Sequence, residues 1–411
     1  MTSSQRARPT NERELRLWRV GRVLALAFAA AVLVAGGIFY ALVVLLDFQE
    51  IDTTAKLDAK TLFDLVKLSF GVVAGAGALV ALVVAYRRQR VDEASAHREA
   101  TRLHTERFSQ AVDKLGSDSP AVRLGGVHAL AGLADDAPTQ DLRQTCIDVL
   151  CAYLRLPFSP NPGEDPTHQE EHHRYLALRT VRHTILRLIG DHYRRPQEAH
   201  RSWQGCDLDL TGVTIDGRLD FSGATFSDGT VSFFGAEFSG GMVHFINAKF
   251  SGSRVSFTNA DLSGSRVSFD EAKFSGSAVS FTNADLSGSR VSFTNTNFSG
   301  GTVSFINAKF SGGAVRFTNA EFSGGAVAFD AADFFDGAVS FSEAKFSGSA
   351  VSFSEAEFSG GQVFFDHAEF SGGTANFNHA SGPAPRGLLD AVSTPGSASV
   401  ALPPAWALPV P

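Results

Sequence analysis

The dodecapeptide TNADLSGSRVSF occupies Thr258 to Phe269 and occurs again, unchanged, at Thr282 to Phe293. It is one copy of a twelve-residue pattern, A-x-[FL]-S-G-x-x-V-x-F-x-x, which repeats thirteen times with few lapses from Ala224 to Phe377. Residues two apart on a strand point to the same face, so each copy supplies two inward pairs between Ser/Gly-rich corners. A unit this short cannot bury its own aromatic rings, and the pattern predicts a solenoid of stacked copies.

The inward centres Phe226, Phe233, Phe238 and Phe245 are seven, five and seven residues apart. The five-residue step resembles that of pentapeptide-repeat proteins, and the resemblance implies square coils that bury two apolar residues on each side. We therefore expect a right-handed quadrilateral β-helix in which two repeats form one coil of about 24 residues. A 12-residue coil is the alternative, but two Phe and a Val would overpack so small a lumen.

The longer coil makes specific predictions about neighbours. It places Leu262 over Leu286 and Asp261 beside Asp285, whereas a 12-residue coil would alternate the signs of the outward charges. Of the 35 Phe in the chain, 28 lie between Phe221 and Phe377, so ring burial is expected to supply most of the stability. A set of asparagines at one corner position either forms a ladder of amide hydrogen bonds or serves the backbone angles of the corner: Asn247, Asn259, Asn283, Asn295, Asn307 and Asn319.

Two charge-free apolar runs near the N-terminus are long enough to cross a bilayer: Val23 to Leu46, with 24 residues, and Leu68 to Tyr86, with 19. They predict transmembrane helices at 23–46 and 62–86, both in contact with lipid. The first run lacks a small-residue cleavage pattern and is interpreted as an anchor and not as a removed leader.

Charge predicts the orientation of these two helices. Residues 1–22 and the stretch Arg87–Arg90 are rich in arginine, whereas the loop 47–61 has an acidic excess. The positive-inside rule then places both termini in the cytoplasm and the loop outside. Three cysteines in 411 residues fit a reducing compartment and are expected to be buried thiols.

A small all-α domain is predicted over 87–200, between the membrane segment and the β-helix at 201–380. A polar helix should continue to Gly116, and Ser119 with Pro120 should start the next. Two further helices are expected at about Thr139–Leu156 and Glu170–Arg195. The Pro/Ala-rich tail 381–411 is predicted to be disordered, although Leu388, Leu389 and Trp406 are candidates for closing the open end of the solenoid.

Catalytic, cofactor and metal sites are not expected. His168, Glu171 and His172 match the H-x-x-E-H spacing of one metalloprotease class, but they lie in a polar run at the start of a helix, without a third ligand, and are interpreted as a solvated helix start. His183 and His192 are interpreted as solvent or interface residues of a basic helix face. Serines recur in the corners without accompanying His and Asp, so nucleophilic catalysis is unsupported.

Charged residues are distributed unevenly along the predicted solenoid. Between Phe221 and Arg316 the acidic and basic residues nearly balance, whereas from Phe317 to Ala380 nine acidic residues face the single Lys345. These nine form a candidate acidic interaction face for a basic partner, with solubility as the alternative explanation. They are Glu321, Asp330, Asp333, Asp336, Glu343, Glu355, Glu357, Asp366 and Glu369.

The resemblance extends beyond the repeats. The stretches RRQR (87–90), AVRLGGVHALAGLA, QTCIDVLCAYLRLP, VRHTILRLI and SWQGCDLDLTGVTIDG are similar to a bacterial membrane-anchored subset of the pentapeptide-repeat family. This implies a location in the bacterial inner membrane and says little about activity. Some soluble members of the family mimic DNA and bind type II topoisomerases, and this chain differs from them in its apolar runs and its twelve-residue spacing.

The predicted function is a non-enzymatic, membrane-tethered scaffold whose rigid β-helix binds an unknown cytoplasmic protein, with no cofactor and no direct nucleic acid. Homo-oligomers are also possible. A DNA-mimic inhibitor of a topoisomerase or another nucleic-acid enzyme is the alternative, and a membrane sensor or transducer is the third hypothesis.

Overall fold

A computed structural model describes residues 29–30, 32–33, 36–37, 40, 59–158, 161–163, 165–393 and 399–406. The chain divides into two units, residues 1–100 and 101–411, and helix α2 (Ala59–Leu115) crosses the boundary between them. The predicted transmembrane helix at 23–46 and the loop at 47–61 lie largely outside the described residues. Residues 62–86 are helical within α2, yet no helix among the described residues is long and apolar enough to cross a membrane, so that prediction is not confirmed.

Three further helices follow α2, and their ends agree with the predictions to within two residues. They are α3 (Pro120–Asp135), α4 (Gln140–Arg155) and α5 (Gln169–Tyr193), the last preceded by the 3₁₀ turn η1 (Pro166–His168). Ser119 and Thr139 are the N-cap residues of α3 and α4, and the Thr139 hydroxyl accepts a hydrogen bond from the amide of Leu142. The helix starts were predictable because capping chemistry is local.

The C-terminal end of α2 takes part in the helical core. Ala111 and Leu115 of α2 are buried, as are Val127 and Leu130 of α3, whereas Val122 of α3 is 42 % exposed. Cys146, Cys151 and Cys206 are buried free thiols, as predicted.

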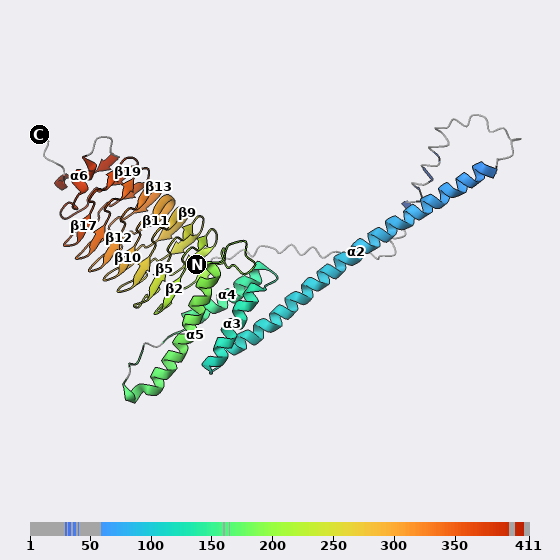
Figure 1. Cartoon of the computed structure of the whole chain (residues 1–411), viewed down its shortest axis with the longest axis horizontal. Helices are drawn as coiled ribbons and strands as arrows, with labels where there is room; N and C mark the ends of the chain where they lie inside the picture. The colour runs from blue at the N-terminus through green and yellow to red at the C-terminus, as the bar shows by residue number, and fades with distance from the viewer. Residues whose placement is uncertain are drawn as a thin grey trace, which may run out of the picture. The chain divides into compact units, whose positions relative to one another are not determined.

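The repeats form a solenoid with four hydrogen-bonded sides. Figure 1 labels strands of its two sheets. We number the sides in chain order by the Phe that each carries in one coil: side 1, Phe226; side 2, Phe233; side 3, Phe238; side 4, Phe245. Side 3 is a ladder of single-residue bridges from Thr214 to Ser381, and the strands form the other three.

The strands are short because each side holds only one or two inward residues. Sides 1 and 2 form one sheet, and three strands span both: β9 (Lys273–Ser280), β11 (Asn297–Ser304) and β13 (Glu321–Ala328). Side 1 also has β3 (Thr225–Phe226), β6 (Lys249–Phe250), β15 (Lys345–Phe346) and β18 (Glu369–Phe370); side 2 also has β1 (Leu208–Asp209), β4 (Thr230–Ser232), β7 (Arg254–Ser256), β16 (Ala350–Ser352), β19 (Thr374–Asn376) and β20 (Ser399–Ala401). Side 4 has β2 (Arg218–Asp220), β5 (Met242–His244), β8 (Arg266–Ser268), β10 (Arg290–Ser292), β12 (Ala314–Arg316), β14 (Ala338–Ser340) and β17 (Gln362–Phe364).

The register confirms the 24-residue coil and excludes the 12-residue alternative. Phe226 pairs in parallel with Phe250, 24 residues on, and Asp261 forms a bridge to Asp285. Like charges are therefore stacked, as only the longer coil predicted. Core volume outweighs their repulsion because exposed charges are screened by water.

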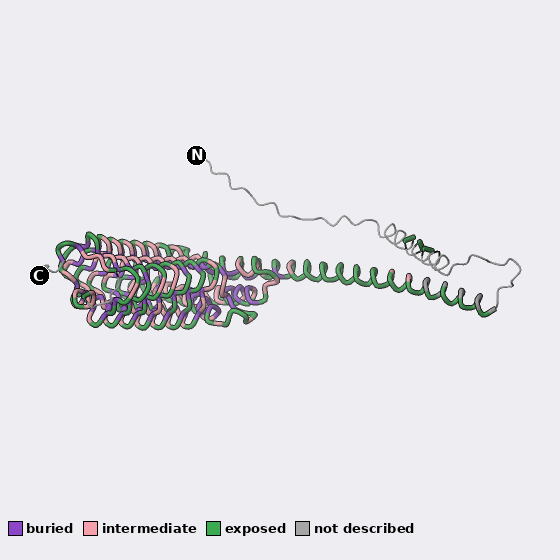
Figure 2. Tube along the Cα trace, turned by 90° about the horizontal axis from the view of Figure 1, so that it is seen from above, coloured by how far each residue is buried: buried purple, intermediate pink, exposed green. Residues whose placement is uncertain are grey.

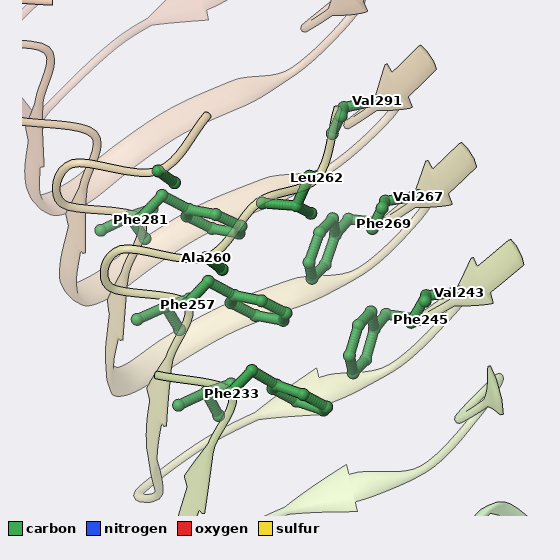
Figure 3. Close-up of a cluster of buried hydrophobic side chains, with 14 of the residues drawn as sticks. Phe233, Val243, Phe245, Phe257, Ala260, Leu262, Val267, Phe269, Phe281 and Val291 are labelled. Atoms are coloured by element: carbon green, nitrogen blue, oxygen red, sulfur yellow. The ribbon is translucent and has the colours of Figure 1, made fainter. Parts of the chain in front are cut away.

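Stacked rings fill the interior. Phe245 stacks on Phe269 with ring centroids 4.7 Å apart, and Phe269 stacks on Phe293 at 4.8 Å. Figure 3 shows two such columns, with Leu262 standing in a third. Inward residues are buried along the whole solenoid, whereas most corner residues are exposed or partly exposed (Figure 2). The two Phe columns visible in the sequence thus become four columns in space.

Both interpretations of the corner asparagines hold. All six have a positive φ, between 54° and 58°, which asparagine tolerates better than most residues. Three of them also form a ladder: Nδ2 of Asn283 donates to Oδ1 of Asn259 over 3.1 Å, and Nδ2 of Asn307 donates to Oδ1 of Asn283 over 3.2 Å. The other three lie on the opposite corner, where Glu271 interrupts the column.

The prediction of a disordered tail is wrong for residues 381–393 and 399–406. The tail forms α6 (Leu388–Val392), strand β20 against β19, and the 3₁₀ turn η2 (Pro404–Trp406). Leu388 is fully buried, and Nε1 of Trp406 donates to the carbonyl of Gly382 over 2.9 Å. Composition suggested disorder, but an open β-helix end offers unpaired backbone groups and apolar surface that a Pro-rich segment can cover.

The opposite end is closed by α5. An added Cβ at Gly190 would lie 2.5 Å from the carbonyl oxygen of Asp220, so only glycine permits this approach of helix and first coil. Asp216 joins the two elements: Nε of Arg179 lies 2.7 Å from its Oδ2 and Nε2 of His183 lies 2.9 Å from its Oδ1. Burial raises the pKa of this carboxyl, but hydrogen bonds from His183 and Arg179 outweigh it, and the pKa is well below its ordinary value.

Asp216 makes stability depend on pH in acid. A depressed folded pKa means that ionised Asp216 stabilises fully above its unfolded pKa of about 3.9, and that this contribution is lost as pH falls through the folded value. We expect Asp216→Asn to lower Tm at neutral pH and to flatten the decline of Tm below about pH 4. Thermal unfolding of wild type, Asp216→Asn and the exposed control Asp228→Asn measures this; equal slopes for all three would contradict it.

Candidate interaction surface

Side 3 carries a column of acidic residues that we call the acidic column. Its outward positions are bridged from coil to coil, and between Thr214 and Ser381, which end the ladder, five of the six positions hold a carboxylate: Glu237, Asp261, Asp285, Lys309, Asp333 and Glu357. Parallel neighbours in such a ladder are about 4.8 Å apart. The 24-residue register thus converts acidic residues that are scattered in the sequence into one line of negative charge.

The backbone of the corner fixes several of these side chains. Oδ1 of Asp261 accepts a hydrogen bond from the amide of Ser263 over 2.8 Å, and Oδ1 of Asp285 accepts one from the amide of Ser287 over 2.9 Å. This turn chemistry holds one oxygen of each carboxylate at the corner. Burial, followed by the charge of Glu357, raises the pKa of Asp333, and Lys309 partly opposes this.

The nine acidic residues proposed from the sequence do not lie on one side. Asp333 and Glu357 are neighbours in the acidic column, with Asp336 on the following corner. Glu321 and Glu369 lie on side 1, separated by Lys345. The remaining four lie on the corners after sides 2 and 4: Asp330, Glu355, Glu343 and Asp366.

Some of these corner residues have structural roles. Oδ1 of Asp330 accepts hydrogen bonds from the hydroxyl of Ser352 and from the amide of Ser354 over 3.0 Å. Asp366 pairs with Arg386 of the tail, with Oδ1 and Nε 3.3 Å apart. Two of the nine predicted residues therefore hold a corner or the tail in place.

Sequence reasoning missed Glu237, Asp261 and Asp285 as members of the same surface. It divided the solenoid along its length, because acidic residues outnumber basic ones near the C-terminal end. Reading the outward position of every second repeat, 24 residues apart, would have found the column. The neighbouring side 4 has the opposite sign in its middle coils, where Arg266 is paired in register with Arg290.

The histidines considered for metal binding do not converge. His172 lies against Asn161, with Nδ1 and Oδ1 3.0 Å apart, and His168 contacts Thr167. Among the described residues no group of three His, Cys, Asp or Glu side chains could hold a metal ion. His192 is not a solvent residue: it is 3 % exposed and packs between Asp135 and Trp203.

The repeats match a known protein family. Residues 257–309 and 335–381 match the family description Pentapeptide repeats (9 copies). Together with the four-sided coils, this defines the C-terminal part of the chain as a pentapeptide-repeat β-solenoid, a class that commonly serves as a scaffold for protein interaction and is generally non-enzymatic. Comparisons with curated proteins and with solved structures gave no match.

Proposed function

We propose that the protein is a membrane-tethered scaffold whose acidic column binds a basic surface of a cytoplasmic protein. The stacking of five carboxylates on side 3 is the observation that supports this. Neighbouring like charges about 4.8 Å apart repel each other by about 1 kcal/mol in water, so the column costs stability. A partner's Lys and Arg side chains would relieve that repulsion and steer association.

The covered ends support binding through the sides. Strand β20 and the tail cover the last coil, and α5 lies against the first. Edge pairing with another chain is thereby disfavoured, and the four sides are the surfaces left for a partner.

The tether is proposed from sequence. Val23–Leu46 and Leu68–Tyr86 carry no charge, and the arginines on their outer flanks favour cytoplasmic termini. The three reduced thiols agree with that compartment. We expect the chain to fractionate with bacterial inner membranes, and a protease added outside spheroplasts to leave the solenoid intact; removal of the solenoid by that protease would contradict the orientation.

Site-specific crosslinking tests the acidic column. A benzophenone side chain introduced at the exposed Ser263, beside Asp261, should crosslink one defined basic protein in cells. Neutralising two rungs with Asp261→Asn and Asp285→Asn should lower the yield about tenfold, equivalent to about 1.4 kcal/mol of binding. The matched control neutralises two carboxylates on side 1, with Glu321→Gln and Glu369→Gln, and should leave the yield unchanged. Equal yields from both double variants would refute the proposal.

A DNA mimic is the second candidate, and the column is also the observation that favours it. The low charge density of the column makes this function less favoured than the scaffold. With Lys309 included, the column carries four net negative charges over about 24 Å, about one per 6 Å. Duplex DNA carries one per about 1.7 Å. Supercoiling by gyrase in the presence of micromolar protein tests the idea, and undiminished supercoiling would remove this candidate.

A further inference from the structure

One corner breaks the repeat. Between side 3 and side 4 the repeat corners read Ser-Gly-Gly or Ser-Gly-Ser at 239–241, 263–265, 287–289, 311–313 and 359–361, whereas residues 335–337 read Phe-Asp-Gly. Phe335 is 53 % exposed, in a solenoid whose other rings are nearly all buried. The corner is still hydrogen-bonded to the coil before it: the amide of Gly312 donates to the carbonyl of Asp336 over 3.1 Å, whereas the amide of Gly288 donates to the carbonyl of Ser311, the residue equivalent to Phe335. Folding therefore does not require the aromatic ring.

The ring lies over the next coil. An added Cβ at Gly360 would be 3.8 Å from Cε2 of Phe335, so the ring packs against this glycine and leaves its remaining surface in solvent. Asp336 has a φ of +52°, an angle that the repeat otherwise reserves for glycine at this corner. Compared with the Ser and Gly of the other corners, the exposed Phe335 is unfavourable for solubility, and Asp336 is unfavourable for stability.

Three acidic residues lie close to Phe335 along the chain or in the next coil. Asp333 precedes it on side 3, Asp336 follows it, and Glu357 is bridged to Asp333 from the next coil. Within the described part of the chain none of the three forms an ion pair within 4.0 Å, and Oδ1 of Asp333 is buried without a hydrogen-bond partner. Lys309 is the neighbour of Asp333 on the side away from Glu357, without an ion pair between them within 4.0 Å, and Glu357 has no basic residue as a neighbour in the column.

A pocket opens next to the ring. Gly361, the residue after the glycine that Phe335 covers, lines a cavity of about 340 Å³ between the last coil and the tail. Phe358, Gln362 and Phe364 line it on the solenoid side, and residues 383–386 line it on the tail side. The exposed ring, the three acidic residues and the pocket are neighbours through Gly360 and Gly361, and together we call them the Phe335 site.

We propose that the Phe335 site binds an arginine side chain of a partner polypeptide, with the adjoining partner residues in the pocket. The inference rests on the proposed function and specifies the partner's chemistry at one point of the acidic column. A guanidinium is planar, so it can stack on the Phe335 ring while donating to Asp333, Asp336 or Glu357. Lysine, a compact and strongly hydrated charge, gains less from the ring.

Restoring the repeat tests the site without endangering the fold. Phe335→Ser and Asp336→Gly each restore one residue of the corner found in the other coils, and Asp336→Gly should keep or raise Tm because it relieves a positive φ. Binding of fluorescent hexa-arginine and hexa-lysine peptides to the full-length chain is measured by polarisation. Wild type should bind hexa-arginine more tightly, and Phe335→Ser should weaken hexa-arginine about three- to tenfold while changing hexa-lysine by less than about twofold.

The control is Phe234→Ser, which removes the other phenylalanine exposed on the solenoid, 45 % exposed in an early coil, and should not alter the binding of either peptide. Equal affinity of wild type for the two peptides, or no effect of Phe335→Ser, would overturn the inference. The crosslinking experiment with the Asp261→Asn/Asp285→Asn variant tests the acidic column without relying on Phe335. The two proposals can therefore fail independently of each other.

Discussion

Phe269→Ala is expected to lower the free energy of unfolding by about 3–5 kcal/mol. The ring is fully buried, stacks on Phe245 and Phe293, and meets Phe257 and Phe281 edge to face. The substitution removes the ring from a continuous column, and the neighbouring coils cannot collapse into the cavity because their spacing is fixed by the ladder hydrogen bonds. Urea unfolding followed by far-ultraviolet circular dichroism measures the loss.

Phe310→Leu is the control for that experiment. Phe310 lies in the side 3 column, where Leu262 and Leu286 occupy the equivalent positions in two other coils, so leucine already fits there. We expect this variant to cost less than about 1.5 kcal/mol. A Phe269→Ala variant no less stable than Phe310→Leu would show that the stacked column is not the main source of stability.

Asp135→Ala is expected to cost about 2–4 kcal/mol, because it leaves two buried donors without an acceptor. Nε1 of Trp203 donates to Oδ1 of Asp135 over 3.1 Å, and Nε2 of His192 lies 3.1 Å from the same oxygen. The His192 ring stacks on Trp203, with centroids 4.1 Å apart. The network joins the end of α3, the end of α5 and the segment that leads into the first coil, so its loss should also loosen the cap on that end.

Hydrogen exchange distinguishes the expected effect from global destabilisation. In Asp135→Ala, amides of α5 and of the first coil should lose protection, while those around Phe293 should not. Asp136→Ala is the matched control, since Asp136 is exposed and adjacent. Uniform loss of protection along the solenoid, or an equal effect of both substitutions, would contradict a junction role for Asp135.

Features that depend on interactions between residues close in sequence could be predicted, and features that depend on distant residues could not. The inward Phe and Val positions, the helix N-caps at Ser119 and Thr139 and the corner asparagines depend on neighbours within a few residues, and the structure confirms them. The tail was mispredicted because its order depends on a surface far away in sequence: Trp406 is buried only because the last coil offers it the carbonyl of Gly382 and the ring of Phe358.

The candidate site was only partly predictable for the same reason. Sequence identified Asp333, Asp336 and Glu357, but it grouped them with Glu321 and Glu343, which lie on other sides of the coil. Position along the chain gives the distance along the solenoid axis. The side on which a residue lies follows only once the coil length is fixed.

By itself, the sequence determined that this protein builds a β-solenoid and which residues fill its interior, because alternation along a strand is a local rule that every repeat restates. Only the tertiary structure decided which outward residues become neighbours, how both ends are covered, and that an acidic column and the Phe335 site exist. Those features depend on the 24-residue coil that the packed rings impose, and contacts between coils cannot be read from any single repeat.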